Sequence, residues 1–377
     1  MKTLEEHLAQ GTPKKILSLD GGGIRGALTL GLLKKIETIL KKKNGDNPDF
    51  RLCDYFDLIG GTSTGSIIAA SLAVGKSVDE ITTLYMDLGG KIFGEKRSWW
   101  NPMETMKFLK ATYDHKSLQE SLQNAFGDIT IGSDKIKTGL CIVAKRADTN
   151  SVWPIINHPK GAYFNSMIGQ NKNIPLWQAV RASSAAPTYF APQMIDVGLG
   201  EQAAFVDGGV SMANNPALTL LMVAALQGFP FHWEMAEDKL EIISLGTGYS
   251  VFSKFTNEID DATILNWASD IPDMLMQDAS WQNRVILQWL SHSPVAEQMD
   301  GEIGNLHSEF LGGKPLLKYL RYNVPLTKFD LNDMNLGMRW DDKMVKDITD
   351  MSAAKNRELL YKIGVVASEK ILEKHFD

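Results

Sequence analysis

Twice within its first 75 residues, the chain shows a short apolar segment that runs directly into a glycine-rich motif and then into a helix-like segment. The first unit consists of residues 15–20, the glycines of 21–26, and 27–43, where leucines and isoleucines recur at helical spacing. The second consists of residues 55–60, the motif 61–65, and a helix of small residues that ends near Val74. A strand followed at once by a helix is the unit from which parallel sheets are built.

The same alternation continues along the chain. Further strands are predicted at residues 136–144, 152–156, 203–206 and 240–245, and further helices at 77–86, 177–184 and 216–226. We therefore predict a three-layer α/β/α fold with a mainly parallel central sheet. After residue 248 the chain becomes rich in Met and Trp and is predicted to be mostly helical. This change indicates a core domain over residues 14–248 and a helical extension or lid over 249–377.

The first glycine motif, Gly21-x-Gly23-x-x-Gly26, fits two functions. It matches a dinucleotide fingerprint, in which the N-terminus of the helix holds a pyrophosphate. It also suits an oxyanion hole, in which the same exposed backbone N–H groups face a developing negative charge. The dinucleotide interpretation requires an acidic residue at the end of the next strand, whereas Asp46 and Asp49 both precede any strand. That difference favours the oxyanion hole.

The second motif, Gly61-Thr-Ser63-Thr-Gly65, has the form G-x-S-x-G between an apolar strand and a helix of small residues. This is the context of a nucleophile elbow, where a sharp turn needs flanking glycines and exposes the serine hydroxyl. The third motif, Asp207-Gly208-Gly209, follows the predicted strand 203–206. An acidic residue at the carboxyl end of a strand lies where active sites of α/β proteins form, although for an isolated Asp a turn or helix N-cap is the preferred explanation.

A serine nucleophile needs a general base, which in most hydrolases is a histidine. None of the seven histidines follows a late predicted strand, where an α/β-hydrolase carries its base. The seven are His7, His115, His158, His232, His292, His307 and His375. The sequence therefore does not provide the usual triad.

Net charge and cysteine content exclude several other classes. The net charge of −6 gives no basic surface for a nucleic-acid polymer. Cys53 and Cys141 form neither a disulfide framework nor a zinc set, and no other metal-ligand spacing is present. The polar N-terminal segment does not have the pattern of a signal peptide. We expect a cytoplasmic protein that contacts membranes peripherally and uses no cofactor or metal.

Taken together, the three motifs resemble the patatin-like phospholipase family, whose pattern is D-G-G-G-x-[RK]-G, G-x-S-x-G and a later D-G-[GA]. The chain supplies all three in this order, beginning at Asp20, Gly61 and Asp207. The segment 177–190 also looks like the helix and loop that precede the family's catalytic Asp. The resemblance covers residues 14–248, and no family motif is present from Tyr249 onward.

The resemblance implies a Ser–Asp dyad without histidine, in which Ser63 attacks an ester carbonyl and Asp207 accepts its proton. Partial burial of Asp207 would raise its pKa and make it a better base. The first motif would supply the oxyanion hole, with Gly22, Gly23 and Ile24 as the expected donors. The residues of that loop are Gly21, Gly22, Gly23, Ile24, Arg25 and Gly26. Arg25 would shape the loop or assist a phosphate-bearing substrate.

The activity implied by the resemblance is hydrolysis of carboxylic esters in phospholipids or related glycerolipids. Two alternatives remain open: an acyltransferase that passes the acyl group to another acceptor, and an antiphage effector phospholipase that a cyclic nucleotide or other small molecule switches on. For contact with lipid, we identify two candidate segments, the loop around Trp99 and Trp100 and the predicted helix 264–290, which is rich in apolar residues.

Overall fold

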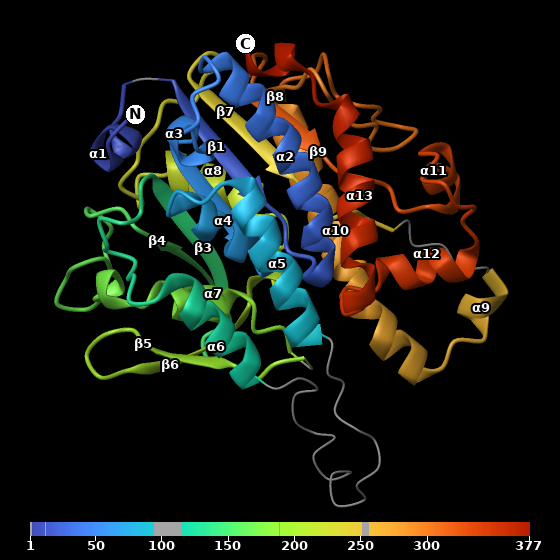
Figure 1. The fold of residues 1–377 in the computed structure, drawn as a ribbon, viewed down its shortest axis with the longest axis horizontal. Coiled ribbons are helices and arrows are strands. Elements are labelled where there is room, and N and C mark those ends of the chain that lie inside the picture. The colour runs from blue at the N-terminus through green and yellow to red at the C-terminus, as the bar shows by residue number, and fades with distance from the viewer. Residues whose placement is uncertain (1, 12, 94–114, 188, 251–255) are drawn as a thin grey trace, which may run out of the picture.

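The computed structural model describes residues 2–11, 13–93, 115–187, 189–250 and 256–377, which form one mixed α/β structure (Figure 1). The loop with Trp99 and Trp100 lies outside the described residues. A nine-stranded sheet runs through the centre in the order β5-β6-β3-β2-β1-β7-β9-β8, and β4 pairs with the other edge of β3. The strands are β1 (Lys14–Leu19), β2 (Leu58–Thr62), β3 (Gly139–Arg146), β4 (Ser151–Ile156), β5 (Gln193–Asp196), β6 (Gln202–Asp207), β7 (Leu240–Leu245), β8 (Ser291–His292) and β9 (Leu317–Tyr322).

The centre of the sheet is parallel and one edge is antiparallel. The strands β1, β2, β3, β7, β8 and β9 pair with one another in parallel. The strands β4 and β6 both pair antiparallel to β3, and β5 pairs antiparallel to β6. The predicted mainly parallel sheet is therefore confirmed, with antiparallel strands confined to one side.

Helices cover both faces of the sheet, which gives the three predicted layers (Figure 1). The helices α2, α4, α5 and α13 lie over one face, and α8 and α10 lie over the other. The helices are α1 (Leu4–Leu8), α2 (Gly26–Lys43), α3 (Leu52–Tyr55), α4 (Thr64–Ala73), α5 (Val78–Phe93), α6 (His115–Phe126), α7 (Leu176–Ser183), α8 (Ala217–Ala225), α9 (Thr256–Asp260), α10 (Ile264–Leu290), α11 (Lys328–Asp333), α12 (Asp342–Thr349) and α13 (Arg357–Ala367).

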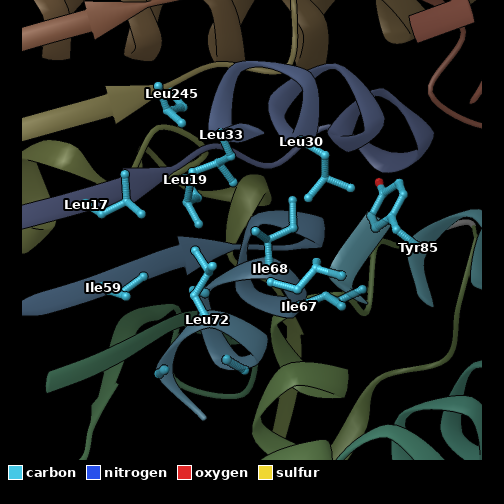
Figure 2. Close-up of a cluster of buried hydrophobic side chains, with 14 of the residues drawn as sticks. Leu17, Leu19, Leu30, Leu33, Ile59, Ile67, Ile68, Leu72, Tyr85 and Leu245 are labelled. Atoms are coloured by element: carbon cyan, nitrogen blue, oxygen red, sulfur yellow. The ribbon is translucent and has the colours of Figure 1, made fainter. Parts of the chain in front are cut away.

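Each face of the sheet carries its own hydrophobic core because side chains alternate along the buried strands. In β1, Leu17 and Leu19 point to the larger core, whereas Ile16 belongs to the smaller one. Figure 2 shows the larger core, where side chains of β1, β2 and β7 meet those of α2, α4 and α5. Continuous apolar strands of this kind are typical of a sheet that is buried on both sides.

The C-terminal part of the chain contains helices α9 to α13, as expected, and also two strands that were not predicted. The longer one, β9, pairs in parallel with β7 and so continues the central sheet. The helix α13 packs against α2 so closely that a Cβ on Gly364 would overlap the carbonyl oxygen of Leu28. Residues after 249 thus add to the sheet as well as covering it.

Candidate active site

Ser63 occupies the sharp turn between β2 and α4. Its backbone adopts φ 55° and ψ −127°, a region that residues other than glycine rarely occupy. The flanking glycines make the turn possible, because a Cβ on Gly61 would overlap the carbonyl of Gly65. A Cβ on Gly65 would in turn overlap the carbonyl of Leu19 in β1. The backbone therefore makes the sharp strand-to-helix turn at Ser63 that a nucleophile elbow requires.

The sheet brings Ser63 next to Asp207. Ser63 follows Thr62, which pairs with Val143 of β3, and Asp207 pairs with Ala144, the next residue of the same strand. The strands β2 and β6 therefore follow each other along the same edge of β3, and Ser63 and Asp207 lie where they meet. The hydroxyl of Ser63 donates a hydrogen bond of 2.5 Å to Oδ2 of Asp207, although 144 positions separate the two residues. Asp207 ends β6, which runs antiparallel to β3 and not parallel as the strand-end argument assumed.

The carboxylate of Asp207 is buried, with 5% of the residue exposed. Its Oδ1 accepts a hydrogen bond of 2.7 Å from the backbone N–H of Gly209, so each oxygen has one donor. Desolvation raises the pKa of Asp207 to about 6, and the hydrogen bonds from Ser63 and Gly209 limit the rise. Gly208 allows the close turn, since a Cβ there would overlap the carbonyl of Val143.

A second serine supports the elbow from α7. The hydroxyl of Ser183 accepts a hydrogen bond of 2.9 Å from the backbone N–H of Ser63 and donates one of 2.6 Å to the carbonyl of Val143. Ser183 therefore ties the backbone of Ser63 to β3. The residue lies in the segment 177–190 that resembles the family, but no sequence pattern distinguishes it from the neighbouring Ser184.

The glycine-rich loop lies directly beside Ser63, because a Cβ on Gly21 would stand 3.1 Å from Cβ of Ser63. Most of its N–H groups have acceptors within the protein. Gly21 donates to the carbonyl of Asn214 at 3.0 Å, and Ile24 donates to the carbonyl of Met351 at 2.8 Å. The N–H groups of Arg25 and Gly26 donate to carbonyls within the loop itself.

Two N–H groups of the loop remain, those of Gly22 and Gly23, and neither donates to an acceptor among the described residues. Gly23 has φ 58°, and a Cβ on it would overlap the carbonyl of Met351, so glycine is required there. Of the three expected oxyanion-hole donors, Gly22, Gly23 and Ile24, the last is excluded because its N–H already donates to the carbonyl of Met351. Gly22 and Gly23 are the donors that can face a substrate oxygen.

Arg25 lies at the junction of the loop and α2. Burial lowers the pKa of its guanidinium to about 10, although the carboxylates of Asp273, Asp20 and Asp350 act in the opposite direction. Its Nε is buried and has no hydrogen-bond partner in the described part of the chain. A positive charge is thus held next to the loop.

Histidines do not contribute to this site in the described part of the chain. His7 contacts Asp57 at 2.9 Å, and His375 contacts the hydroxyl of Tyr322 at 2.7 Å. His158 packs edge-on against Phe231, and desolvation lowers its pKa to about 4. Among the described residues, the hydrogen-bond partners of the Ser63 side chain and of the Asp207 carboxylate include no imidazole.

The described part of the chain contains neither a metal-binding cluster nor a membrane-spanning helix. Within the residues that the structure describes, no three side chains of His, Cys, Asp or Glu gather closely enough to hold a metal ion. None of the helices in that part of the chain combines the length and the apolar character needed to cross a bilayer.

Comparisons with known proteins agree with this geometry. The family model described as patatin-like phospholipase matches residues 17–221. A cGAMP-activated phospholipase of Vibrio cholerae is 36% identical over 208 residues, which are 54% of this chain and 55% of that protein. A cGAMP-activated phospholipase of Escherichia coli is 31% identical and covers 62% of each chain. Patatin-17 of Solanum cardiophyllum is 28% identical and covers 62% of this chain and 60% of its own. The matched region thus spans between about half and two thirds of these relatives.

Proposed function

The chain belongs to the patatin-like phospholipase family, and on that premise we propose that it hydrolyses carboxylic esters of phospholipids or related glycerolipids through an acyl-Ser63 intermediate. The observation that carries this proposal is the 2.5 Å hydrogen bond from the hydroxyl of Ser63 to the buried carboxylate of Asp207. A nucleophile whose proton already points at a base is the arrangement that acyl transfer requires.

In the acylation step, the hydroxyl oxygen of Ser63 forms a bond to the ester carbonyl carbon while Asp207 accepts the hydroxyl proton. A pKa of about 6 leaves this carboxylate mainly ionised at neutral pH and more basic than an ordinary aspartate. The carbonyl oxygen becomes an oxyanion, which the N–H groups of Gly22 and Gly23 stabilise. When the tetrahedral intermediate collapses, the C–O bond to the alcohol breaks and Asp207 returns its proton to the leaving oxygen.

In the deacylation step, Asp207 accepts a proton from a water molecule that attacks the acyl-serine. The second tetrahedral intermediate then releases the fatty acid and restores the hydroxyl of Ser63. Arg25 places a positive charge beside the same loop, which suits a substrate that carries a phosphate near the reacting ester.

The dyad is tested by Ser63→Ala and Asp207→Ala. Each should lower the release of fatty acid from phospholipid vesicles by about 10⁴-fold or more, and the double variant should be no slower than either, because the two groups act as one unit. Mass spectrometry of the released lipids measures the rate. Ser71→Ala is a matched control, since it removes a buried hydroxyl of α4 that has no partner among the described residues. If Asp207→Ala kept most of the activity, Asp207 would not be the base.

A specific observation supports regulation by a small molecule. Two relatives at 36% and 31% identity are cGAMP-activated phospholipases, and they match more than half of this chain. We propose that this chain also takes an activator of the cyclic-nucleotide class. The C-terminal part offers a route for such control, because its residue Met351 contacts the glycine-rich loop.

The activator proposal predicts that cGAMP increases vesicle hydrolysis by at least about tenfold and raises the unfolding temperature, because a ligand that binds only the folded chain stabilises it. A mixture of GMP and AMP is the control. The unfolding temperature reports binding even if turnover does not change. If cGAMP changed neither the rate of vesicle hydrolysis nor the unfolding temperature, this chain would not be a cGAMP-activated phospholipase.

We further propose that α10 contacts the lipid surface. One face of its N-terminal half carries exposed apolar side chains at helical spacing, with Ile264 86% exposed, Ile271 46% and Leu275 63%. The same helix reaches the active site, because Asn283 donates to the carbonyl of Met212, five residues after Asp207. An apolar face that continues towards the site suits a substrate whose acyl chain leaves a bilayer.

A further inference from the structure

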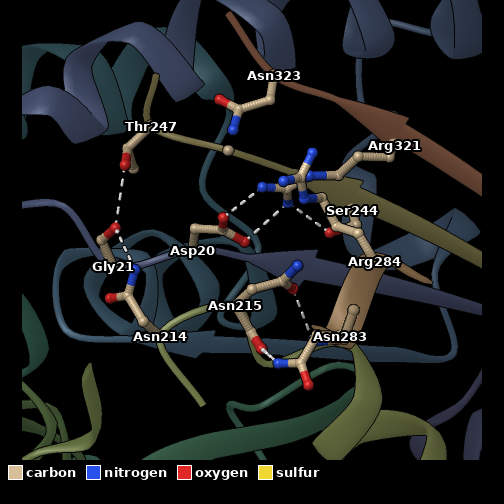
Figure 3. A network of polar contacts seen from close by, with 12 residues as sticks. Asp20, Gly21, Asn214, Asn215, Ser244, Thr247, Asn283, Arg284, Arg321 and Asn323 are labelled. Atoms are coloured by element: carbon tan, nitrogen blue, oxygen red, sulfur yellow. Dashed lines mark hydrogen bonds and ion pairs between the residues drawn. The ribbon is translucent and has the colours of Figure 1, made fainter. Parts of the chain in front are cut away.

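A buried ion pair holds the residue that precedes the glycine-rich loop. Asp20 follows β1 directly and leads into Gly21. Its two carboxylate oxygens accept hydrogen bonds of 2.9 and 2.6 Å from the two terminal nitrogens of Arg321, which belongs to β9. Both side chains are buried. Figure 3 shows the guanidinium of Arg321 facing the carboxylate of Asp20, with Ser244 beside it.

The strand register explains how residues 301 positions apart meet. Ser18 of β1 pairs with Ser244 of β7, and Ser244 pairs with Arg321 of β9. Arg321 therefore lies two strands from β1, near the edge of the sheet at which β1 ends and the glycine-rich loop begins. The hydroxyl of Ser244 accepts a hydrogen bond of 2.7 Å from the same guanidinium and so keeps it between the two strands.

The loop itself is held at most of its remaining polar groups. The carbonyl of Gly21 accepts a hydrogen bond of 3.0 Å from Thr247, and that of Gly23 accepts one from the hydroxyl of Tyr85. The N–H of Ile24 donates to Met351. Figure 3 shows Thr247 and Asn214 on the two sides of Gly21. Because these hydrogen bonds hold the backbone of the loop, the orientation of the unbonded N–H groups of Gly22 and Gly23 is also fixed.

We propose that Arg321 is a positioning residue for the oxyanion hole: by holding Asp20, it sets the direction in which the N–H groups of Gly22 and Gly23 point. This inference rests on the proposed acyl-hydrolase function. Preorganised donors stabilise a transition state only when they already point at the oxyanion position, and small displacements reduce their effect strongly. A buried carboxylate without its partner would draw in water or a proton, and the loop that starts one residue later would shift.

In this proposal Arg321, which lies in the C-terminal part of the chain, is necessary for the chemistry at the N-terminal motifs. A purely structural role of Arg321 predicts something different, because the loss of activity would then follow the loss of folded protein. The test therefore needs a control from the same strand. Lys318 of β9 also forms an ion pair, with Glu241 of β7 at 3.3 Å, but it lies at the opposite end of the strand.

The experiment compares Arg321→Met, Arg321→Lys and Lys318→Met with the wild type on a soluble short-chain ester and with a fluorophosphonate that labels Ser63. Arg321→Met should lower kcat and the labelling rate by about 10²–10³-fold, the loss that follows removal of an oxyanion donor. KM should change by less than about twofold, and the pH at which activity falls on the acid side should not move. Arg321→Lys should recover part of the rate, and Lys318→Met should retain the wild-type rate.

The double variant Asp20→Asn, Arg321→Met keeps the proposal testable if Arg321→Met alone does not fold, because it leaves no unpaired buried charge. It should unfold near the wild-type temperature and still react slowly. A double variant that folds and reacts at the wild-type rate overturns the positioning role. A wild type that neither hydrolyses esters nor labels at Ser63 contradicts the proposed function instead, so the two failures are distinguishable.

Discussion

At the scale of single residues, the environment of Asp207 explains how one carboxylate can replace a histidine. An aspartate in water has a pKa near 4 and is a weak base at neutral pH. Burial between β3 and the serine turn raises this pKa to about 6, and Gly209 and Ser63 provide the two hydrogen bonds that keep the ionised form accessible. The base is thus adjusted by desolvation and not by a neighbouring charge.

This shift predicts the pH dependence of turnover. Asp207 must be ionised to accept a proton, so kcat/KM should rise with pH and level off above its pKa. The midpoint should lie near pH 6, well above the value of about 4 expected for a solvated carboxylate. Initial rates on a soluble ester between pH 4.5 and 8.5 measure it. A midpoint near 4 would show that Asp207 is not the titrating group.

The same shift has a consequence for stability. Because the pKa is higher in the folded state than in the unfolded chain, folding takes up a proton between about pH 4 and 6. The contribution of Asp207 to stability therefore falls as pH rises through that window and stays low above it. A shift of two units corresponds to about 3 kcal/mol. Asp207→Asn should thus be more stable than the wild type at pH 8, where urea unfolding measures the difference, while losing activity. Equal stability at pH 8 would contradict this.

At the scale of elements, α10 is the helix that we propose to link a lipid surface to the site. Its bounds, Ile264–Leu290, are those predicted from the sequence. Ile264, Ile271 and Leu275 of its N-terminal half are exposed, whereas Asn283 and Leu287 further along are buried. The helix therefore has a packed half and an open half. The open half is the part available to a bilayer.

We predict that Ile271→Ser combined with Leu275→Ser weakens turnover on liposomes by about tenfold or more and barely changes turnover of a soluble ester. Burying one such side chain fully contributes about 1.5–3 kcal/mol, so two partly inserted ones account for this loss. Phe329→Ser is the control, because Phe329 is an even more exposed apolar residue on another helix, α11. Losses of equal size on both substrates would mean that the α10 residues support the fold and do not contact lipid.

At the scale of the whole molecule, the residues after 249 are part of the structure that forms the site. The strand β9 covers the edge of β7, Arg321 pairs with Asp20, and Met351 bonds to the glycine-rich loop. The packing of α13 on α2 depends on Gly364, whose position leaves no space for a side chain. Sheet, loop and helix layer are therefore all completed by the C-terminal part.

This organisation predicts that a chain ending at residue 248 does not fold cooperatively. Such a fragment would expose the edge of β7 and leave the buried carboxylate of Asp20 unpaired, and the second change alone costs about 3–5 kcal/mol. Circular dichroism during heating and limited proteolysis measure the outcome. Co-expression of residues 249–377 should restore a folded complex. A fragment 1–248 that melts in a single sharp transition would instead identify an independent domain.

The sequence by itself determined what depends on local pattern. Glycines at fixed spacing and the change from apolar strand to helical periodicity located the turn at Ser63, the loop at 21–26 and the strand before Asp207. The strands β5, β8 and β9 were missed. The segment of β9 carries Lys318 and Arg321 among apolar residues, and only pairing with β7 makes it a strand.

Tertiary structure decided what depends on residues far apart in the chain. It brought Ser63 to Asp207 along one edge of β3, where Asp207 comes from an antiparallel strand that local pattern could not orient. It also left Gly22 and Gly23, but not Ile24, with unbonded N–H groups, because Met351 supplies an acceptor from the far end of the chain. Hydrogen bonds and burial of this kind follow from the packing of the whole sheet, which no short stretch of sequence contains.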